Sequence, residues 1–477
     1  MNSARMFMNI KSLKSIANLV LPALLLAVGV LLSASTGPAA TARTSTATAN
    51  WGTAATWSPN GVPAAGDTIT ILSGHTVTIA AAALSPATLT INSGGQLTVG
   101  GYNLTVTGAT TVNGTLEHNS TAGTHTFTGN VTINSGGAWN VTAAATITCS
   151  GNVTNNSGGT WSETAAATIS FAGNLQNDGT FTASTGTHTF TGSATKTFSG
   201  INEISIPNVA ITGAYQNNGI LTVGTALSGS SLVNSGTGTL NLGGATTTAI
   251  SITTLTATAS GNAVNYTGAA QTVKATAYRG LTLSGSSVKT MPSGTSVTGN
   301  LSIAPAGNAT ASIAAGVNLS VGSLTLGGLG RTNGTWGSTS STATSKNNTY
   351  FEATTGYLTV NTDNRATPTV SVWPTASSIV VGQALSRSTL TGGTASVPGS
   401  FAFTVPQTVP PMGSSNYSAA ATFTPTDNTS YSSVSNTISM TVLTPVITVQ
   451  PQNGVVAVGG SASLSVTNSG TAPVGYQ

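Results

Sequence analysis

The sequence predicts an all-β protein in which a parallel β-helix (β-solenoid) is followed by smaller β-sandwich modules. Residues 124–145 are followed without a gap by a second copy, residues 146–167, and 15 of the 22 aligned positions are identical. Only 4% of the residues are charged, while the abundant Thr and Val favour strands and the abundant Gly and Asn favour turns. The composition then changes after Asn361, because more than half of the 18 prolines follow it.

The length of the repeat predicts the length of one solenoid coil. A third copy opens at Thr168 and a fourth at Thr187. A fixed period of this length is typical of a solenoid, in which each repeat buries its apolar face against its neighbours. We therefore expect about 22 residues per coil and about 13 coils, with the solenoid and its N-terminal cap occupying residues 43–362.

The aligned copies also sort side chains by face. His125, Ile147, Ile169 and His188 share one strand position and predict one inward column. Phe127, Cys149, Phe171 and Phe190 predict a second. Asn134 and Asn156 fall on the turn, where stacked amides are expected to form a ladder.

Residues 1–42 read as a secretory signal peptide. Arg5, Lys11 and Lys14 precede the apolar run 19–32, and Ala40-Thr41-Ala42 offers a cleavage site of small residues. The run is short for a membrane-spanning helix, although an uncleaved anchor is the alternative. No other membrane span is expected after cleavage, so the chain is expected to be extracellular or on the cell surface.

Both ends of the repeat region resemble known proteins. The N-terminal stretch PAAGDTITI…GHTVTI resembles the first coils of secreted bacterial β-solenoid proteins. The segment GTWGSTSSTAT…NNTYF…TGYLTV resembles the end of the repeat region in secreted bacterial β-strand-repeat, adhesin-like surface proteins. A cap is also expected physically, because the first coil would otherwise expose an open strand edge.

The remainder predicts β-sandwich modules. Residues 366–443 hold five strand candidates separated by turn signals. The order VGQALSRSTLTGG, PGSFAF, ATFTPTDNTSY and TISMTV resembles the Ig-like modules of bacterial surface proteins. Residues 444–477 resemble the start of a second Ig-like domain, and we expect that domain to be truncated in this chain.

Charge and cysteine usage exclude several classes. Three of the 12 Lys and Arg residues lie in the expected leader, which leaves nine against eight acidic residues. No basic patch interleaved with aromatic residues is present, so no nucleic-acid partner is expected. The single cysteine, Cys149, excludes an internal disulfide framework and reads as a small buried hydrophobe.

Few residues suggest catalysis. A glycosidase needs two carboxylates close together, and nothing in the spacing of Glu163, Asp178 and Glu203 requires this. Glu117 and His118, with His125 nearby, are expected to be an exposed turn pair and not a metal site, which would need three or four ligands. We therefore expect no catalytic, cofactor-binding or metal-binding residues and no cofactor, in a protein that is not an enzyme.

Trp139, Trp161 and Phe181 are the candidate ligand-contact residues, because they recur at the repeat period. Exposed on a rod, such a column could stack against sugar rings. The alternative, which we favour, is an aromatic stack that fills a corner of each coil.

These features favour a non-enzymatic, secreted or cell-surface structural and adhesive stalk. Its expected partners are glycans or other surface proteins, bound through a repetitive surface. The alternatives are a polysaccharide-active or carbohydrate-binding β-helix protein, and a passive spacer or coat component.

Overall fold

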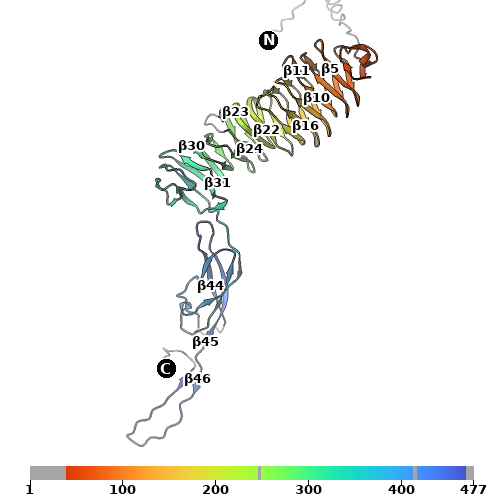
Figure 1. Ribbon diagram of the computed structural model, residues 1–477. Helices are drawn as coiled ribbons and strands as arrows, with labels where there is room; N and C mark the ends of the chain where they lie inside the picture. Colours follow the sequence, from red (N-terminus) through yellow and green to blue (C-terminus); the bar gives the residue numbers. More distant parts are fainter. Residues whose placement is uncertain (1–38, 245–248, 412–415, 469–477) are drawn as a thin grey trace, which may run out of the picture.

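The computed structural model describes residues 39–244, 249–411 and 416–468. Their largest part is a parallel β-solenoid of about 12 turns, which confirms the predicted all-β repeat architecture (Figure 1). Smaller sheets follow it. Most of the expected signal peptide and the last residues of the chain lie outside the described residues.

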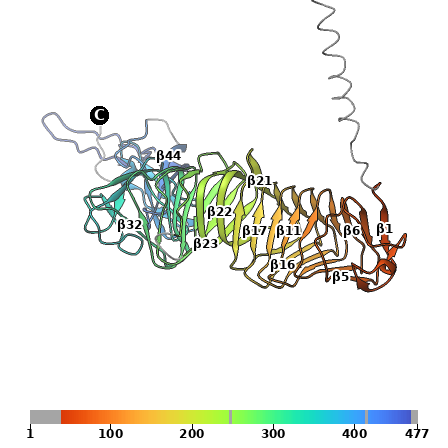
Figure 2. The same ribbon diagram turned by 90° about the horizontal axis from the view of Figure 1, so that it is seen from above.

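Each early coil contributes one strand to each of three faces, and Figure 2 shows the strands of successive coils stacked along the rod. Face 1 contains β8 (Leu104–Val106), β11 (Thr124–Phe127), β14 (Thr146–Cys149), β17 (Thr168–Phe171) and β20 (Thr187–Phe190). Face 2 contains β4 (Thr68–Ile71), β6 (Thr88–Ile91), β9 (Thr110–Val112), β12 (Val131–Ile133), β15 (Val153–Asn155), β18 (Leu175–Asn177) and β21 (Lys196–Ser199). Face 3 contains β2 (Ala49–Asn50), β5 (Thr76–Ile79), β7 (Gln96–Val99), β10 (Thr115–His118), β13 (Ala138–Val141), β16 (Thr160–Glu163) and β19 (Thr180–Thr182).

Strict alternation along the strands forms the core. In β14 the side chains of Ile147 and Cys149 are buried, whereas those of Thr146 and Thr148 face outward. The parallel ladders then align equivalent positions of successive coils, as with His125, Ile147 and Ile169. Both inward columns that the repeat predicts on face 1 are therefore confirmed.

The Asn-Ser-Gly-Gly turns need both of their glycines. Gly136 has φ of 78°, a left-handed conformation that side chains with a Cβ disfavour. The next residue, Gly137, lies so close to the carbonyl oxygen of Val112 that an added Cβ would clash with it. The turn sequence therefore fixes how tightly consecutive coils stack.

The later coils use longer strands. Faces 1 and 2 belong to one large sheet of 27 strands. In this large sheet, β22 (Ile204–Asn217) pairs with both β20 and β21, so it runs through face 1 and face 2. The large sheet continues through β23 (Ile220–Asn234), β24 (Thr239–Leu242), β25 (Thr254–Thr256), β26 (Ala263–Tyr266), β28 (Ala277–Tyr278), β29 (Leu281–Gly285), β31 (Ser296–Gly307) and β33 (Asn318–Leu326). A separate three-stranded sheet is formed by β27 (Gln271–Thr272), β30 (Val288–Met291) and β32 (Thr310–Ile313).

Both ends of the solenoid are covered. At the N-terminal end, β1 (Ala42–Ser45) pairs with β3 (Trp57–Ser58) and β4, and the short 3₁₀ helix η1 (Ala54–Thr56) lies between β2 and β3. Trp51 and Trp57 are buried there with ring centroids 4.9 Å apart. At the other end lie β34 (Leu329–Gly330), β35 (Gly334–Gly337), β36 (Ser345–Lys346) and β37 (Tyr357–Val360), of which β37 pairs with β33.

The chain beyond the solenoid forms small separate sheets. Two-stranded sheets pair β38 (Val370–Val372) with β42 (Thr394–Ala395), and β39 (Thr375–Ala376) with β41 (Leu390–Thr391). A four-stranded sheet contains β40 (Ile379–Val380), β43 (Gly399–Phe403), β44 (Asn416–Pro425) and β45 (Val434–Leu443). The 3₁₀ helix η2 (Leu385–Arg387) follows β40. Finally, β46 (Ile447–Val449) pairs with β47 (Thr467–Asn468).

These sheets have a hydrophobic core of their own, separate from that of the solenoid. It is built from Ile379, Leu385, Phe403, Ala419, Ala421, Ile438, Met440 and Val442. The chain from 366 to 443 is thus a distinct packing unit, which we call the second unit. It follows the end of the solenoid in Figure 1.

Candidate functional site: polar and aromatic columns of the solenoid

The repeated aromatic residues lie inside the coil. Trp139, Trp161 and Phe181 align on β13, β16 and β19, with ring centroids 4.6 and 5.5 Å apart. Their exposed fractions are 0%, 0% and 8%. They fill the interior of face 3 and present no open ring face to a sugar, so an exposed aromatic column does not describe this structure.

The expectation of an exposed Glu117–His118 turn pair is wrong for His118. The pair lies on β10, where alternation turns the histidine inward and leaves Glu117 outward. There His118 stacks with Trp139, with ring centroids 5.6 Å apart, and lies against the tilted ring of His125, with centroids 4.7 Å apart. Glu117 accepts a hydrogen bond from Gln96 on the neighbouring strand.

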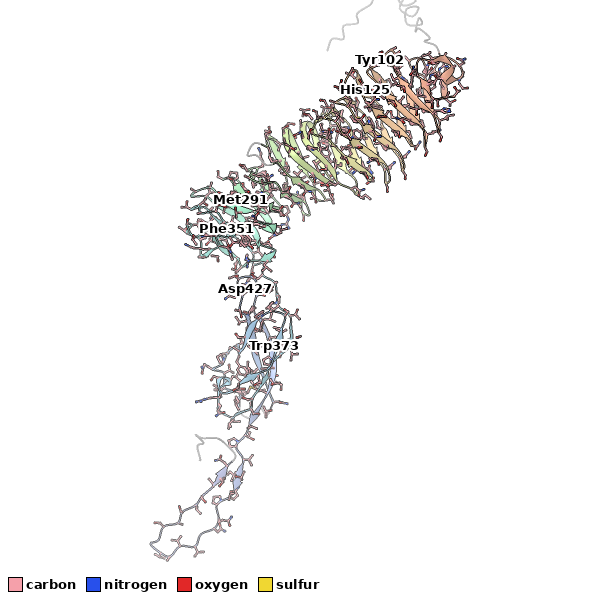
Figure 3. The ribbon with its side chains drawn as sticks, in the orientation of Figure 1. Tyr102, His125, Met291, Phe351, Trp373 and Asp427 are labelled. Carbon is pink, nitrogen blue, oxygen red and sulfur yellow. The ribbon has the colours of Figure 1, made fainter. Side chains whose placement is uncertain are left out.

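Both imidazoles of this pair are neutral at ordinary pH. Each side chain is fully buried, and none of the four ring nitrogens has a hydrogen-bond partner. Burial lowers the pKa of His118 well below 6.5, and the neighbouring His125 lowers it further. Burial also lowers the pKa of His125. His125 is labelled in Figure 3.

A second buried polar cluster centres on Glu163. Its Oε1 accepts hydrogen bonds from Trp161 Nε1 (2.7 Å) and contacts His188 Nε2 (3.0 Å), and its Oε2 contacts the backbone N–H and hydroxyl of Ser184. The other nitrogen of His188 faces the carbonyl oxygen of Gly186. Both ring nitrogens of His188 thus lie within hydrogen-bond distance of an oxygen, and the interior holds a hydrogen-bonded Glu163–His188 pair.

The other carboxylates considered for catalysis have separate partners. Asp178 accepts from the backbone N–H of Ile201, and Glu203 accepts from Thr222. Among the residues that the structure describes, no group of three or more His, Cys, Asp or Glu side chains is arranged to hold a metal ion. Cys149 is buried between Phe127 and Phe171 in the register of face 1, and this burial raises the pKa of its thiol.

Asparagine ladders follow the coil corners. The expected outer ladder is confirmed, because Asn156 donates to Asn134 and Asn134 donates to Asn113. An inner ladder was not predicted. In it, buried Asn155 donates to Asn177, and buried Asn217 donates to Asn234. Its sequence signal is an Asn that ends a strand just before a Gly-containing turn.

Lys289 on β30 is another polar residue that sequence reasoning missed. Its side chain is fully buried, and Nζ donates to the carbonyl oxygens of Gly268, Ala269 and Ser286. Burial lowers the pKa of Lys289 to about 8. Lys289 therefore links the loop that contains Gly268 and Ala269 to the loop that contains Ser286.

The outward surface of face 1 is an uncharged array. Thr126, Thr148, Ser170 and Thr189 align on consecutive strands. Two positions earlier, Thr124, Thr146 and Thr168 form a parallel column. Neighbouring strands are about 4.8 Å apart, so short polar groups repeat at that interval along the rod. Face 2 continues the pattern with the column Thr70, Thr90, Thr111, Thr132 and Thr154.

Comparison of the chain with protein-family models, with curated proteins and with solved structures finds no match. Among the described residues, no helix is long and apolar enough to cross a membrane. Functional inference therefore rests on the chain's own geometry.

Proposed function

We propose that the protein is a non-enzymatic structural and adhesive stalk, secreted or displayed on a bacterial cell surface. The observation that carries the proposal is the outward array of Thr and Ser on the consecutive strands β11, β14, β17 and β20 of face 1. Each group makes only a weak contact, but identical contacts repeated along a rigid rod add up through multivalency. An uncharged, hydroxyl-rich array suits neutral glycans or the polar faces of neighbouring surface proteins.

The sequence supports the same proposal. Residues 1–42 read as a secretory leader, and residues 366–443 resemble an Ig-like module of bacterial surface proteins. A second module would begin at residue 444. In this arrangement the second unit and the module after it are spacers that carry the solenoid away from its point of attachment.

Two observations support a role without catalysis. The buried carboxylate Glu163 is fully engaged by interior donors and does not face solvent. The reactive groups of His118, His125 and Cys149 are likewise inside the coil. A polysaccharide-active protein remains the alternative function, as does a passive spacer without ligand.

The test uses the full chain immobilised on a sensor surface, with neutral and acidic polysaccharides and a second copy of the chain as analytes. The triple variant Thr126→Gln/Thr148→Gln/Ser170→Gln disturbs face 1 with longer neutral side chains. Glutamine fits such a position, since Gln176 occupies the face 2 column next to Thr154. The matched control is Asn140→Gln/Ser162→Gln/Thr182→Gln, whose three positions align outward on face 3.

We expect the face 1 variant to lose binding while the face 3 control keeps it, with unchanged circular dichroism for both. Equal binding by both variants would refute face 1 as the contact surface. No binding by the unmodified chain would favour a spacer, and release of oligosaccharides would favour an enzyme.

A further inference from the structure

A cavity lies where the solenoid meets the second unit. Its volume is about 400 Å³, within the range of small-molecule sites. The solenoid end contributes Arg331, Trp336, Ser345, Lys346 and Asn347, and the second unit contributes Asp427 and Thr429. Asp427 is labelled at this junction in Figure 3. This cavity is separate from the outward columns and does not depend on their function.

Arg331 connects the end of the solenoid to the second unit. It follows β34, and its Nη1 donates to the hydroxyl groups of Ser430 and Thr429 in the second unit. Its Nη2 donates to the carbonyl oxygen of Leu326. The residue is only 9% exposed, and its buried Nε has no hydrogen-bond partner. A guanidinium has five N–H donors, and the bonds of Nη1 and Nη2 leave one Nη2 N–H free for an acceptor in the cavity.

A second cation lines the same cavity. Lys346 on β36 donates to the carbonyl oxygens of Thr339 and Ser341. An ammonium has three donors, so these two bonds leave capacity for one more. Asn347, the next residue, also lines the cavity. Its side-chain oxygen is used by the backbone N–H of Thr349.

Asp427, the carboxylate that lines the cavity, accepts hydrogen bonds from residues close to it in the sequence. Oδ1 of Asp427 accepts from the backbone N–H and hydroxyl of Thr429 and from the backbone N–H of Ser430. These bonds lower the pKa of Asp427 to about 2, so the group is ionised throughout the physiological range. Two cations and one carboxylate give the lining a net charge of about +1.

We propose that this cavity binds a carboxylate-bearing, hydroxyl-rich small molecule, namely a uronic acid unit. The carboxylate of the ligand accepts from Arg331 and Lys346, since a guanidinium matches the planar geometry of a carboxylate. The ionised Asp427 disfavours a dianion such as sulfate or phosphate, but it accepts hydrogen bonds from sugar hydroxyls. Because both units contribute residues, a bound sugar acid also bridges the junction.

Isothermal titration calorimetry of the full chain tests this, with sodium glucuronate and sodium galacturonate as probes and glucose and sodium sulfate as comparisons. We expect both uronates to bind, with affinity that falls as salt is raised. Glucose and sulfate should bind at least about tenfold more weakly, since each lacks one half of the recognised chemistry.

The variants separate recognition from folding. Lys346→Met removes a cation from an exposed side chain and should weaken uronate binding about tenfold, as loss of one charge-assisted hydrogen bond does. Asn347→Ala should weaken it less. Lys274→Met, outside the cavity, is the matched control and should leave binding unchanged. Arg331→Gln should abolish uronate binding, but it also removes contacts between the two units. The test of the proposal is therefore the uronate affinity of Lys346→Met.

Three outcomes would overturn the proposal: no heat of binding with either uronate, equal affinity for glucose or sulfate, or unchanged uronate affinity in Lys346→Met. A uronate affinity that falls in Lys346→Met and holds in Lys274→Met supports it.

Discussion

The imidazole rings of His118 and His125 contact each other inside the solenoid, tilted by 54° with centroids 4.7 Å apart, and no ring nitrogen has a hydrogen-bond partner. The residues aligned with them on adjacent strands are Val99 and Val141 for His118, and Leu104 and Ile147 for His125. None of these can ionise. Phe127 and Trp139 complete the surroundings of His118. The pair therefore has no counter-charge on the strands that pack against it.

We predict that the protein loses stability in acid because of this pair. The unfolded chain binds protons near pH 6.5, whereas burial lowers the pKa of both histidines in the folded state. The stability is thus fully present above about pH 6.5 and falls as the pH falls below it. Each histidine that stays neutral contributes a loss of about 1.4 kcal/mol per pH unit. Urea unfolding monitored by circular dichroism between pH 4 and pH 8 measures this.

The matched variant is His118→Val/His125→Ile, which copies residues found at the same positions in neighbouring coils. It should flatten the pH dependence between pH 4 and pH 6.5. A variant that keeps the full acid sensitivity of the unmodified chain would place the cause at other groups.

The buried Glu163–His188 pair predicts a different pattern. Glu163→Val and His188→Ile should each destabilise the protein by about 1–3 kcal/mol, because each leaves a buried hydrogen-bonding group without its partner. The double variant Glu163→Val/His188→Ile should cost less than the sum of the two single variants, because the two side chains contact each other and removing the second leaves nothing further unpaired between them. Urea midpoints at pH 7 compare the three variants. Losses that simply add in the double variant would contradict a direct coupling between Glu163 and His188.

Much of the fold follows from the repeat itself. Because His125, Ile147 and His188 occupy the same strand position in their copies of the repeat, they are predicted to form one inward column, and the parallel ladders confirm it. The same rule would also have placed His118 inside, because it shares strand parity with the buried Leu116. Reading its local sequence as a turn obscured this. Where side chains alternate strictly along a strand, the position of a residue in the strand predicts its burial better than the polarity of the surrounding sequence does.

Other features depend on contacts that no local pattern encodes. Glu163 meets His188 across 25 residues, in a coil shortened by a deletion relative to the earlier copies. The cavity at the junction joins Arg331 to Ser430, nearly 100 residues away. The sequence does not predict that Glu163 contacts His188 or that Arg331 contacts Ser430, because the repeat fixes register only between equivalent positions of successive coils.

The aromatic stack predicts a stability effect in place of a binding effect. Trp161→Ala should cost about 3–5 kcal/mol, because it opens a cavity between Trp139 and Phe181. Trp161→Phe should cost less, since phenylalanine occupies the same column one coil later. Thermal unfolding measures both. A loss of glycan binding by Trp161→Phe at unchanged stability would instead assign the ring to a ligand.

The two asparagine ladders should differ in their effect on stability. Asn177→Leu removes the buried oxygen that accepts from one N–H of the Asn155 side chain and from the backbone N–H of Gly179, while Asn155 keeps its bond to the carbonyl oxygen of Thr180. Each orphaned buried group costs about 1–3 kcal/mol. Asn156→Ala removes one bond of the outer ladder, where water can replace it, and should cost about 1 kcal/mol or less. Urea unfolding of the two variants makes the comparison. Equal losses would mean that the inner ladder is no more essential than the outer one, and a larger loss in Asn177→Leu would establish buried amides as the groups that hold successive coils in register.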